Sequence, residues 1–545
     1  MADIVIVNPR FNTSFWGMEG CMDMLGKRAN LPVACLPLLA ALVPKHHQVT
    51  IVDENVEDID FDRLGRADMV CVTGMSVQGD RLCEILREIR DRGVLAVVGG
   101  AMATVEPEEL EGLADVIFIG EADVTFPQFI DDWERGCHSA RYVQADKTNM
   151  ASLPLPRLDL LKSDRYMFGS MQISRGCPFT CEFCDIIVTF GRKPRLKSVD
   201  QVLGELDAYH QAGVRIVFVV DDNLIGNKKA IKPILLEIEK WQKAHAYALT
   251  LFTEASLDLA EDDELMELLG RAGFQSVFIG IESPNEESLK ETKKLQNVRE
   301  RAGSLLDRIK RIQDRGLDVW CGMIVGFDND TPDAFRVLPP FLDSARIANA
   351  LIGLLHAIPT TPLYDRLKKE QRLNDAADSA RYGTNVVPLG MSRNELRAGL
   401  VDVTREAYAP DAYFRRLDAL FLQSGFQFAV HRLPYWRQHR GAWALSCIEN
   451  YIMFAVLAGR LIRNVKSPQL RAKYRSQLSA AFRARPWEPQ LLFTYAVKTA
   501  MHYHYTSITD ALVSTGDGPL PAAVRSFSRT KSNAAMSLGN KAATS

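Results

Sequence analysis

The stretch that decides the fold reads Ser174-Arg-Gly-Cys177-Pro-Phe-Thr-Cys181-Glu-Phe-Cys184. It places three cysteines on one short loop. A 4Fe–4S cluster is normally held by four thiolates, so three thiolates leave one iron open to a further ligand. The alternative is a structural zinc site, which requires four ligands and usually has paired Cys-x-x-Cys units. No second pair is evident in the sequence, which favours the cluster.

Short apolar segments lead into this loop and recur after it, alternating with helical patterns. Most of them end in polar or glycine residues, which is typical of the carboxyl ends of buried parallel strands. Six such units predict a partial (β/α)6 barrel with its active site at the carboxyl ends of the strands. The predicted strands are residues 170–174, 215–220, 249–252, 276–279, 318–321 and 351–355.

The N-terminal part has a second series of short, β-branched apolar runs separated by helical patterns such as residues 81–92. This alternation predicts an α/β, doubly wound (Rossmann-like) parallel sheet, in which ligands bind at the carboxyl ends of the strands. The predicted strands are residues 4–7, 49–52, 69–72, 95–98 and 116–119.

The two series are separated by Leu-Pro-Leu-Pro at residues 153–156, which indicates a linker. From about Met391 the pattern is mostly helical, and the last residues are rich in Ser, Ala and Lys, which predicts disorder. The predicted organisation is an N-terminal domain (1–150), a linker (151–168), the barrel (169–390), a helical C-terminal domain (391–525) and a disordered tail (526–545).

The bulk composition is that of a soluble globular protein of several domains. The 545 residues are 47% hydrophobic and 24% charged, and the formal net charge of −3 gives no reason to expect a nucleic-acid partner. Ten cysteines, clustered only in the loop, indicate a reducing compartment rather than a disulfide framework. The N-terminus does not resemble a signal peptide, and no uncharged apolar stretch reaches about 20 residues. We therefore expect a cytoplasmic protein.

The Cys-x-x-x-Cys-x-aromatic-Cys loop resembles the signature of the radical S-adenosylmethionine (SAM) superfamily. The resemblance implies that Cys177, Cys181 and Cys184 hold a 4Fe–4S cluster whose open iron binds SAM. It also implies an aromatic residue near adenine, carboxylates for the SAM ammonium group, a ribose-side motif and a fifth-strand glycine motif. Each of these could instead be an ordinary core or solvated residue. They are Phe183, Asp221, Asp222, Glu254, Glu282, Ser283, Gly322, Ile324 and Gly326.

A doubly wound domain preceding this barrel resembles the cobalamin-binding class of radical SAM enzymes. The alternative is that its glycine-rich turns hold no ligand. The Asp-x-His-x-x-Gly motif, whose histidine ligates cobalt in many cobalamin enzymes, is absent from residues 1–150, so the axial ligand is in doubt. The residues implied for cobalamin binding are Gly74, Ser76, Gln78, Gly99, Gly100, Gly120 and Glu121.

Over its whole length the chain is most similar to hopanoid C-2 methylase-like proteins. The stretches that carry this similarity include residues 14–16, 184–186, 191–195, 220–223 and 359–363. The resemblance implies methylation of an unactivated carbon in a large apolar substrate such as an isoprenoid or tetrapyrrole, with an electron donor such as flavodoxin or ferredoxin. The alternatives are a radical cyclisation or rearrangement and, in another class, a non-catalytic cobalamin sensor. No side chain is assigned a catalytic role.

Residues 443–462 form a very apolar helical stretch followed by several basic residues. Two interpretations remain open. The stretch is either a surface that meets a bilayer or a lipid-like substrate, or a core helix of the third domain with a solvated basic flank. The first interpretation would add a peripheral membrane contact to the expected cytoplasmic location.

Overall fold

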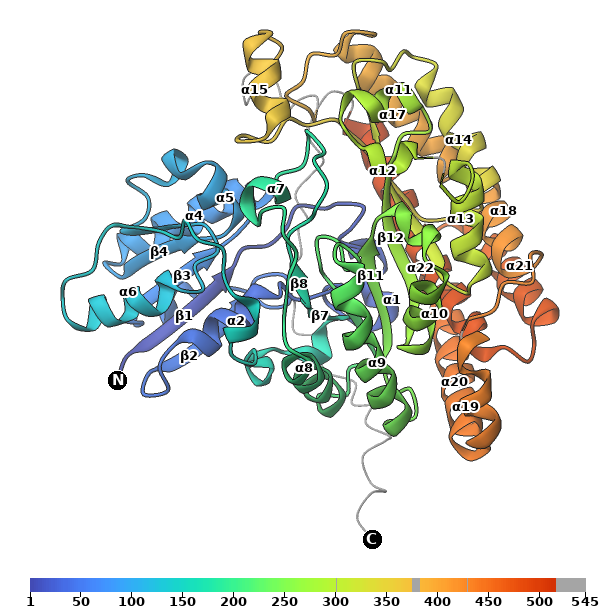
Figure 1. The fold of residues 1–545 in the computed structure, drawn as a ribbon, viewed down its shortest axis with the longest axis horizontal. Helices are drawn as coiled ribbons and strands as arrows, with labels where there is room; N and C mark the ends of the chain where they lie inside the picture. The colour runs from blue at the N-terminus through green and yellow to red at the C-terminus, as the bar shows by residue number, and fades with distance from the viewer. Residues whose placement is uncertain (300, 375–382, 429, 516–545) are drawn as a thin grey trace.

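The computed structural model describes residues 1–545 except 300, 375–382, 429 and 516–545, so the predicted tail lies outside the described residues. Two parallel six-stranded sheets dominate the fold (Figure 1). The predicted α/β architecture, with a helical C-terminal region, is therefore confirmed.

The N-terminal sheet has the strand order β2-β1-β3-β4-β5-β6. Two hydrophobic clusters occupy its opposite faces, because its strands are apolar on both sides. Helix α4 (Gly79–Asp91) packs on one face, and α2 (Cys35–Leu42) and α6 (Thr125–Glu134) pack on the other. The strands are β1 Asp3–Asn8, β2 Gln48–Asp53, β3 Met69–Thr73, β4 Leu95–Gly99, β5 Val116–Ile119 and β6 Arg141–Val143.

The second sheet is the predicted partial barrel, with the order β14-β13-β12-β11-β10-β7 and all pairs parallel. Its crossover helices include α8 (Val199–Gln211), α9 (Lys228–Ala244) and α10 (Asp263–Arg271). The strands are β7 Gly169–Met171, β10 Ile216–Val219, β11 Thr250–Ala255, β12 Phe274–Glu282, β13 Asp318–Val325 and β14 Ala350–Leu354.

The N-terminal segment crosses between the two sheets before the first domain is complete. Trp16 packs against Phe218 of β10 and Phe278 of β12, with ring centroids 5.5 and 5.7 Å apart. Helix α1 (Glu19–Leu25) then contacts the C-terminal helix α22 (Pro489–Thr515). The first domain and the barrel therefore share one hydrophobic core.

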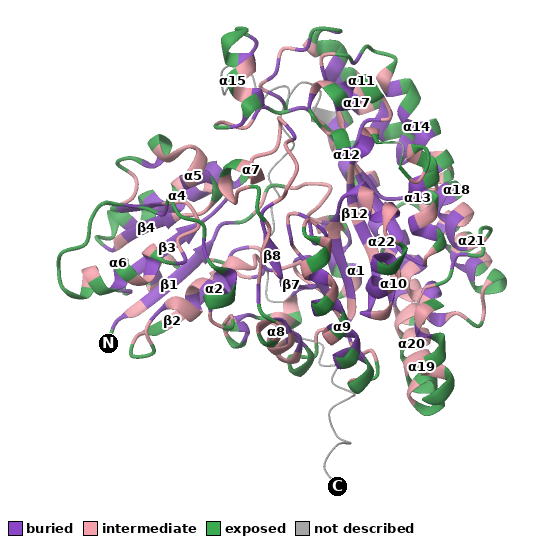
Figure 2. Cartoon of the chain, in the orientation of Figure 1, coloured by how far each residue is buried: buried purple, intermediate pink, exposed green. Residues whose placement is uncertain are grey.

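The apolar stretch 443–462 lies in helix α20 (Arg440–Asn464), which packs on α21 (Pro468–Ala484) and α22. Only Leu457 and Leu461 of α20 are buried, so the helix is not a core helix along its length (Figure 2). Among the described residues it is the one helix long and apolar enough to span a membrane by length and composition.

Candidate functional site

The cysteine loop is closed at its base by a short antiparallel ladder. Strand β8 (Ser174–Arg175) pairs with β9 (Arg195–Leu196). Gly176 follows β8 with φ +97°, and a Cβ there would lie 2.9 Å from the carbonyl oxygen of Gly191. Glycine is required at this position because both the left-handed backbone and the close chain approach exclude a side chain.

Asp221 and Asp222, which follow β10, both bind the backbone that leads into the loop. The Asp221 carboxylate accepts hydrogen bonds from the backbone amides of Ile173 (2.7 Å) and Ser174 (2.8 Å) and from the Ser174 hydroxyl. An Asp222 oxygen accepts from the Gly176 amide at 2.7 Å. Asp221 is 1% exposed, so in this structure it positions the loop rather than facing a ligand.

The spacing of the three thiols distinguishes a site for one zinc ion from a site for an iron–sulfur cluster. A zinc ion with Zn–S bonds of about 2.3 Å would bring its thiolate sulfurs to within roughly 4 Å of one another. In the described part of the chain, the only group of three or more Cys, His, Asp or Glu side chains with ligand atoms within 4.8 Å is His46, His47 and Glu134. The sulfurs of Cys177, Cys181 and Cys184 are therefore too widely spaced for one zinc ion, and the donor set fits a larger iron–sulfur cluster.

Two amide side chains point at these sulfurs, and the sequence did not reveal either. The Nδ2 group of Asn223 donates to Sγ of Cys177 at 3.9 Å, and the Nε2 group of Gln296 donates to Sγ of Cys181 at 3.6 Å. Such N–H···S contacts stabilise thiolates and tune the reduction potential of a cluster. Burial raises the pKa of Cys177 and raises that of Cys184 to about 12, so these thiols need a nearby cation to ionise.

Lys294 is a largely buried cation in this region, with a side chain that is 13% exposed. Its Nζ lies 2.8 Å from the carboxylate of Glu282 and 5.9 Å from the ring centroid of Phe183. Burial lowers the pKa of Lys294, but the charges of Glu282 and Cys181 outweigh burial and raise the pKa overall. Lys294 therefore offers positive charge beside the thiolates, a role that the sequence alone did not indicate.

Glu254 is the penultimate residue of β11, and it is a partly buried acid without a salt bridge among the described residues. Burial, reinforced by the nearby charge of Asp222, raises the pKa of Glu254 to about 8. Burial likewise raises the pKa of Asp222 to about 6. Both residues line the large cavity described below. A bound ammonium group would offset this burial cost, so these carboxylates fit the amino group of SAM.

The remaining residues predicted for SAM binding surround this region without lining the cavity. Phe183 lies 6.3 Å from Phe327 between ring centroids, in a small apolar cluster that also includes Ile324. A Cβ at Gly322 would lie 3.2 Å from the Phe278 ring, and Gly326 has φ +103°. The Ser283 hydroxyl accepts from the Asn285 amide, which caps the turn after β12.

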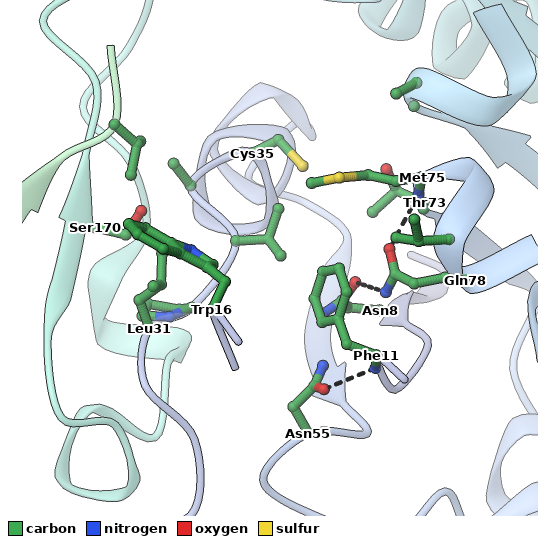
Figure 3. A pocket seen from close by; sticks show the side chains of 18 of the residues that line it. Asn8, Phe11, Trp16, Leu31, Cys35, Asn55, Thr73, Met75, Gln78 and Ser170 are labelled. Atoms are coloured by element: carbon green, nitrogen blue, oxygen red, sulfur yellow. Dashed lines mark hydrogen bonds between the residues drawn. The ribbon is translucent and has the colours of Figure 1, made fainter. Parts of the chain in front are cut away.

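A cavity of about 1190 Å³ lies between the carboxyl ends of the two sheets. It exceeds the roughly 300–1,000 Å³ typical of single-ligand pockets, so it offers room for a large cofactor and part of a substrate. Aromatic and aliphatic side chains such as Phe11, Trp16 and Leu31 face it, with the sulfur atoms of Cys35 and Met75 (Figure 3). The sequence did not single out Phe11, Leu31 or Cys35. Phe11 and Leu31 lie in loops, which carry no periodic signal, and Cys35 is the first residue of α2.

Most residues predicted for cobalamin line this cavity, and Ser76 does not. Gln78 is held inside the domain, where its side chain bonds Asn8, the Pro9 carbonyl and the Met75 amide. The Glu121 carboxylate pairs with Arg175 and Arg195, and the hydroxyl of the exposed Ser76 donates to Glu106. The lining residues among those predicted are Gly74, Gln78, Gly99, Gly100, Gly120, Glu121, Asp222 and Glu254.

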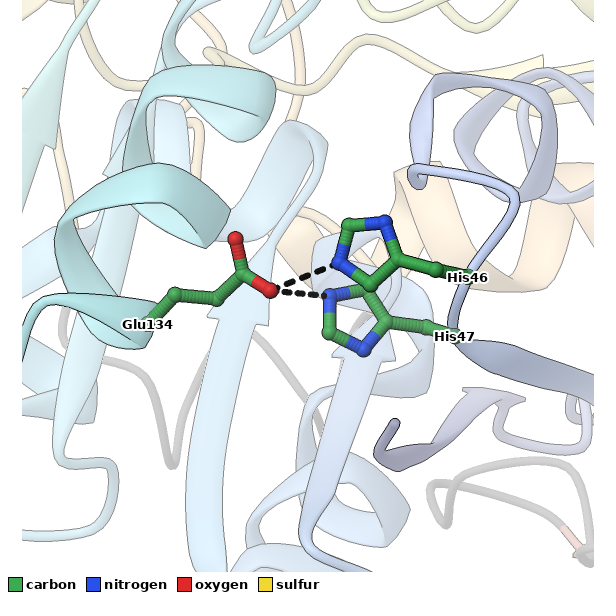
Figure 4. A group of neighbouring side chains, drawn as sticks. All are labelled: His46, His47 and Glu134. Atoms are coloured by element: carbon green, nitrogen blue, oxygen red, sulfur yellow. Dashed lines mark hydrogen bonds and ion pairs between the residues drawn. The ribbon is translucent and has the colours of Figure 1, made fainter.

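The group His46, His47 and Glu134 lies at the opposite, amino edge of the sheet (Figure 4). The Nδ1 atom of His47 accepts from the Ala2 amide at 3.2 Å, so a neutral ring carries its proton on Nε2, which lies 3.1 Å from the Glu134 carboxylate. A protonated Nε2 has no lone pair for a metal ion. No histidine of the described chain lines the cavity.

Three family models match successive parts of the chain. Residues 3–130 match the B12 binding domain, residues 171–338 match the radical SAM superfamily, and residues 361–516 match a domain of unknown function, DUF4070.

Two relatives cover most of the chain. An uncharacterized methyltransferase of Synechocystis sp. is 39% identical over 77% of this chain and 79% of its own length. The hopanoid C-2 methylase of Rhodopseudomonas palustris is 34% identical over 76% of this chain and 78% of its own. The chain therefore belongs to the family of cobalamin-binding radical SAM methyltransferases, enzymes whose cofactors are a 4Fe–4S cluster, SAM and cobalamin.

Solved structures show the same fold at low sequence identity. OxsB, a cobalamin-dependent SAM radical enzyme with aqua-cobalamin and SAM bound, has a TM-score of 0.55 at 14% identity, covering 94% of this chain and 80% of its own. TsrM from Kitasatospora setae, with cobalamin and a 4Fe–4S cluster bound, also has a TM-score of 0.55 at 16% identity, covering 68% of this chain and 75% of its own.

Proposed function

We propose that this enzyme methylates an unactivated carbon of a polycyclic isoprenoid. The observation that carries the proposal is the large, mostly apolar cavity between the two sheets. A relative named hopanoid C-2 methylase, 34% identical, supports an isoprenoid over a tetrapyrrole, since the bacteriochlorophyllide methyltransferases of Chlorobaculum tepidum are only 23% and 25% identical.

The residues around the cysteine loop have separate tasks in this proposal. Cys177, Cys181 and Cys184 hold the cluster, while Asp222 and Glu254 bind the ammonium group of SAM. When bound, the cluster and SAM supply the radical that removes a substrate hydrogen, and cobalamin supplies the methyl group. Flavodoxin or ferredoxin is proposed as the electron donor.

The cavity lining holds the substrate and limits water. Trp16 and Phe218 are in ring contact at its barrel side, and both line it. An apolar wall of this kind orients a hydrocarbon skeleton and protects a reactive carbon centre from side reactions. The Gly74 and Gly99-Gly100 loops form the opposite wall of the cavity, and in this proposal the corrin ring of cobalamin packs against that wall.

The test is turnover by anaerobically reconstituted, full-length enzyme with a polycyclic triterpene. We expect 5′-deoxyadenosine together with a product that has gained one CH₂ unit. Cys181→Ala should abolish both products, whereas Cys137→Ala, a change to an exposed cysteine outside the loop, should retain them.

Three outcomes would contradict the proposal. A product that has the mass of the substrate, or that is oxidised without gaining a methyl group, would favour cyclisation or rearrangement. Methylation of a tetrapyrrole but not of a triterpene would show that the substrate class is wrong. Absence of 5′-deoxyadenosine from a correctly loaded enzyme would favour a cobalamin sensor.

A further inference from the structure

The outer face of α20 is apolar and exposed. Leu445 is 65% exposed, Ile448 is 54% exposed and Ile452 is 57% exposed, and they follow one another at helical spacing. A helix face of this kind normally lies against another part of the protein, whereas a large exposed apolar patch marks an interaction site.

Two neighbouring aromatic residues extend this face. Phe454 of α20 stacks on Phe482 of α21, and the Tyr451 hydroxyl donates to the carbonyl oxygen of Pro486, next to Trp487. Phe482 is 47% exposed and Trp487 is 85% exposed. We refer to the following residues as the α20 patch: Trp443, Leu445, Ile448, Ile452, Phe482 and Trp487.

The segment that carries the patch is strongly basic. Residues 437–487 contain ten Lys and Arg residues and one acid, Glu449, in a chain whose net charge is −3. Glu449 is itself paired with Arg215 at 2.9 Å. Within the described residues, the exposed side chains of Arg440 and Arg483 form no salt bridge, so unpaired positive charge lies close to Trp443 and Phe482 in the sequence.

We propose that the α20 patch docks on the surface of an anionic lipid bilayer. Exposed tryptophan and aliphatic side chains beside basic residues match the interfacial layer of such a membrane. A second copy of the chain is a poorer occupant, because a symmetric contact would bring the two basic segments together. Helix α20 does not cross the bilayer in this arrangement, because Leu457 and Leu461 are buried in the protein and Arg460 donates a hydrogen bond to the carbonyl oxygen of Met24.

Flotation of full-length protein with phospholipid vesicles tests this proposal independently of catalysis. Binding is expected to vesicles of phosphatidylcholine mixed with phosphatidylglycerol and to weaken in high salt and with phosphatidylcholine alone. The double variant Ile448→Ser/Ile452→Ser should bind at least about tenfold more weakly, because both side chains lose their apolar contact with lipid. Val337→Ser/Leu389→Ser, at two equally exposed positions elsewhere, should bind as wild type.

The contribution of basic residues to membrane binding is tested with a second double variant and its control. Arg440→Gln/Arg483→Gln should weaken binding by about 30-fold at low salt, since each basic residue near an anionic surface contributes several-fold. Arg87→Gln/Lys229→Gln, which removes two exposed charges distant in sequence, should have little effect. Equal binding by test and control variants would overturn the proposal. So would a protein dimer, detected by light scattering, that the Ile448→Ser/Ile452→Ser change dissociates.

Discussion

Glu121 is the acid at the centre of a buried ion network that joins the two domains, and replacing it is the sharpest test of the interface. Its carboxylate pairs with Arg175 at 2.8 Å and Arg195 at 2.9 Å, and its side chain is 1% exposed. Arg175 also pairs with Asp123, a buried acid of the N-terminal domain. Since Arg175 stands two residues before Cys177, this network holds the cysteine loop against the N-terminal sheet.

The cost of Glu121→Gln can be bounded from these contacts. Removing one partner of a fully buried pair typically costs about 3–5 kcal/mol. Here Arg175 keeps Asp123, Arg195 keeps hydrogen bonds to the carbonyl oxygens of Thr148 and Phe190, and Gln keeps an acceptor oxygen. The expected loss is therefore about 2 kcal/mol, or roughly a 30-fold increase in local opening of the interface.

Native-state hydrogen exchange at the amides of residues 174–177, in the apoprotein, measures this opening directly. In the loaded enzyme the same change should raise the ratio of 5′-deoxyadenosine to methylated product, because substrate is held less precisely between the cofactors. Glu111→Gln is the control, since the exposed Glu111–Arg141 pair should contribute less than about 1 kcal/mol. If the two variants exchange alike, the network does not hold the loop and the reasoning is refuted.

Three further predictions concern the cluster, the acid proposed to bind SAM, and cobalamin. Gln296→Leu should shift the cluster reduction potential to a more negative value in a redox titration followed by electron paramagnetic resonance, because the reduced thiolate loses an N–H donor; an unchanged potential would contradict the contact. Burial raises the folded-state pKa of Glu254 to about 8, so its contribution to apoprotein stability is complete below pH 4.5 and is lost as pH rises through about 8. Urea unfolding should show that Glu254→Gln lacks this part of the decline, and parallel pH profiles would count against it. The cob(II)alamin spectrum should show no nitrogen splitting from a protein ligand, and His46→Ala and His47→Ala should leave it unchanged; a splitting that either variant removes would show that histidine ligates cobalt.

The sequence predicted the strands well where they are buried on both faces. All six barrel strands and five of the six N-terminal strands were expected, because their apolar runs end in polar or glycine residues. The sixth N-terminal strand, β6, was missed because Arg141–Val143 has an exposed, buried, exposed pattern over three residues. The sequence could not decide the nature of residues 443–462, since exposure depends on which elements cover a helix.

The contacts that complete the site were also beyond prediction, because they join residues distant in sequence. Trp16 meets Phe278 across 262 positions, and Gln296 reaches Cys181 across 115 positions. Glu121 was expected near cobalamin from the resemblance to the cobalamin-binding class. Glu121 lines the cavity, and its carboxylate also pairs with two arginines of the barrel, a relation that no local pattern encodes.

These long-range contacts explain how one chain can hold two reactive cofactors in register. Methyl transfer to a carbon radical requires the cluster side and the cobalamin side to face one substrate at fixed separation. Arg175 belongs to the ladder that closes the cysteine loop and also to the ion network of Glu121 and Asp123. Arg175 is joined to Cys177 by two peptide links, Arg175–Gly176 and Gly176–Cys177. A displacement of the N-terminal sheet is therefore transmitted directly to the cysteine loop. The linker adds to this junction, because the Tyr166 hydroxyl donates to the buried Asp53 of the N-terminal sheet at 2.7 Å.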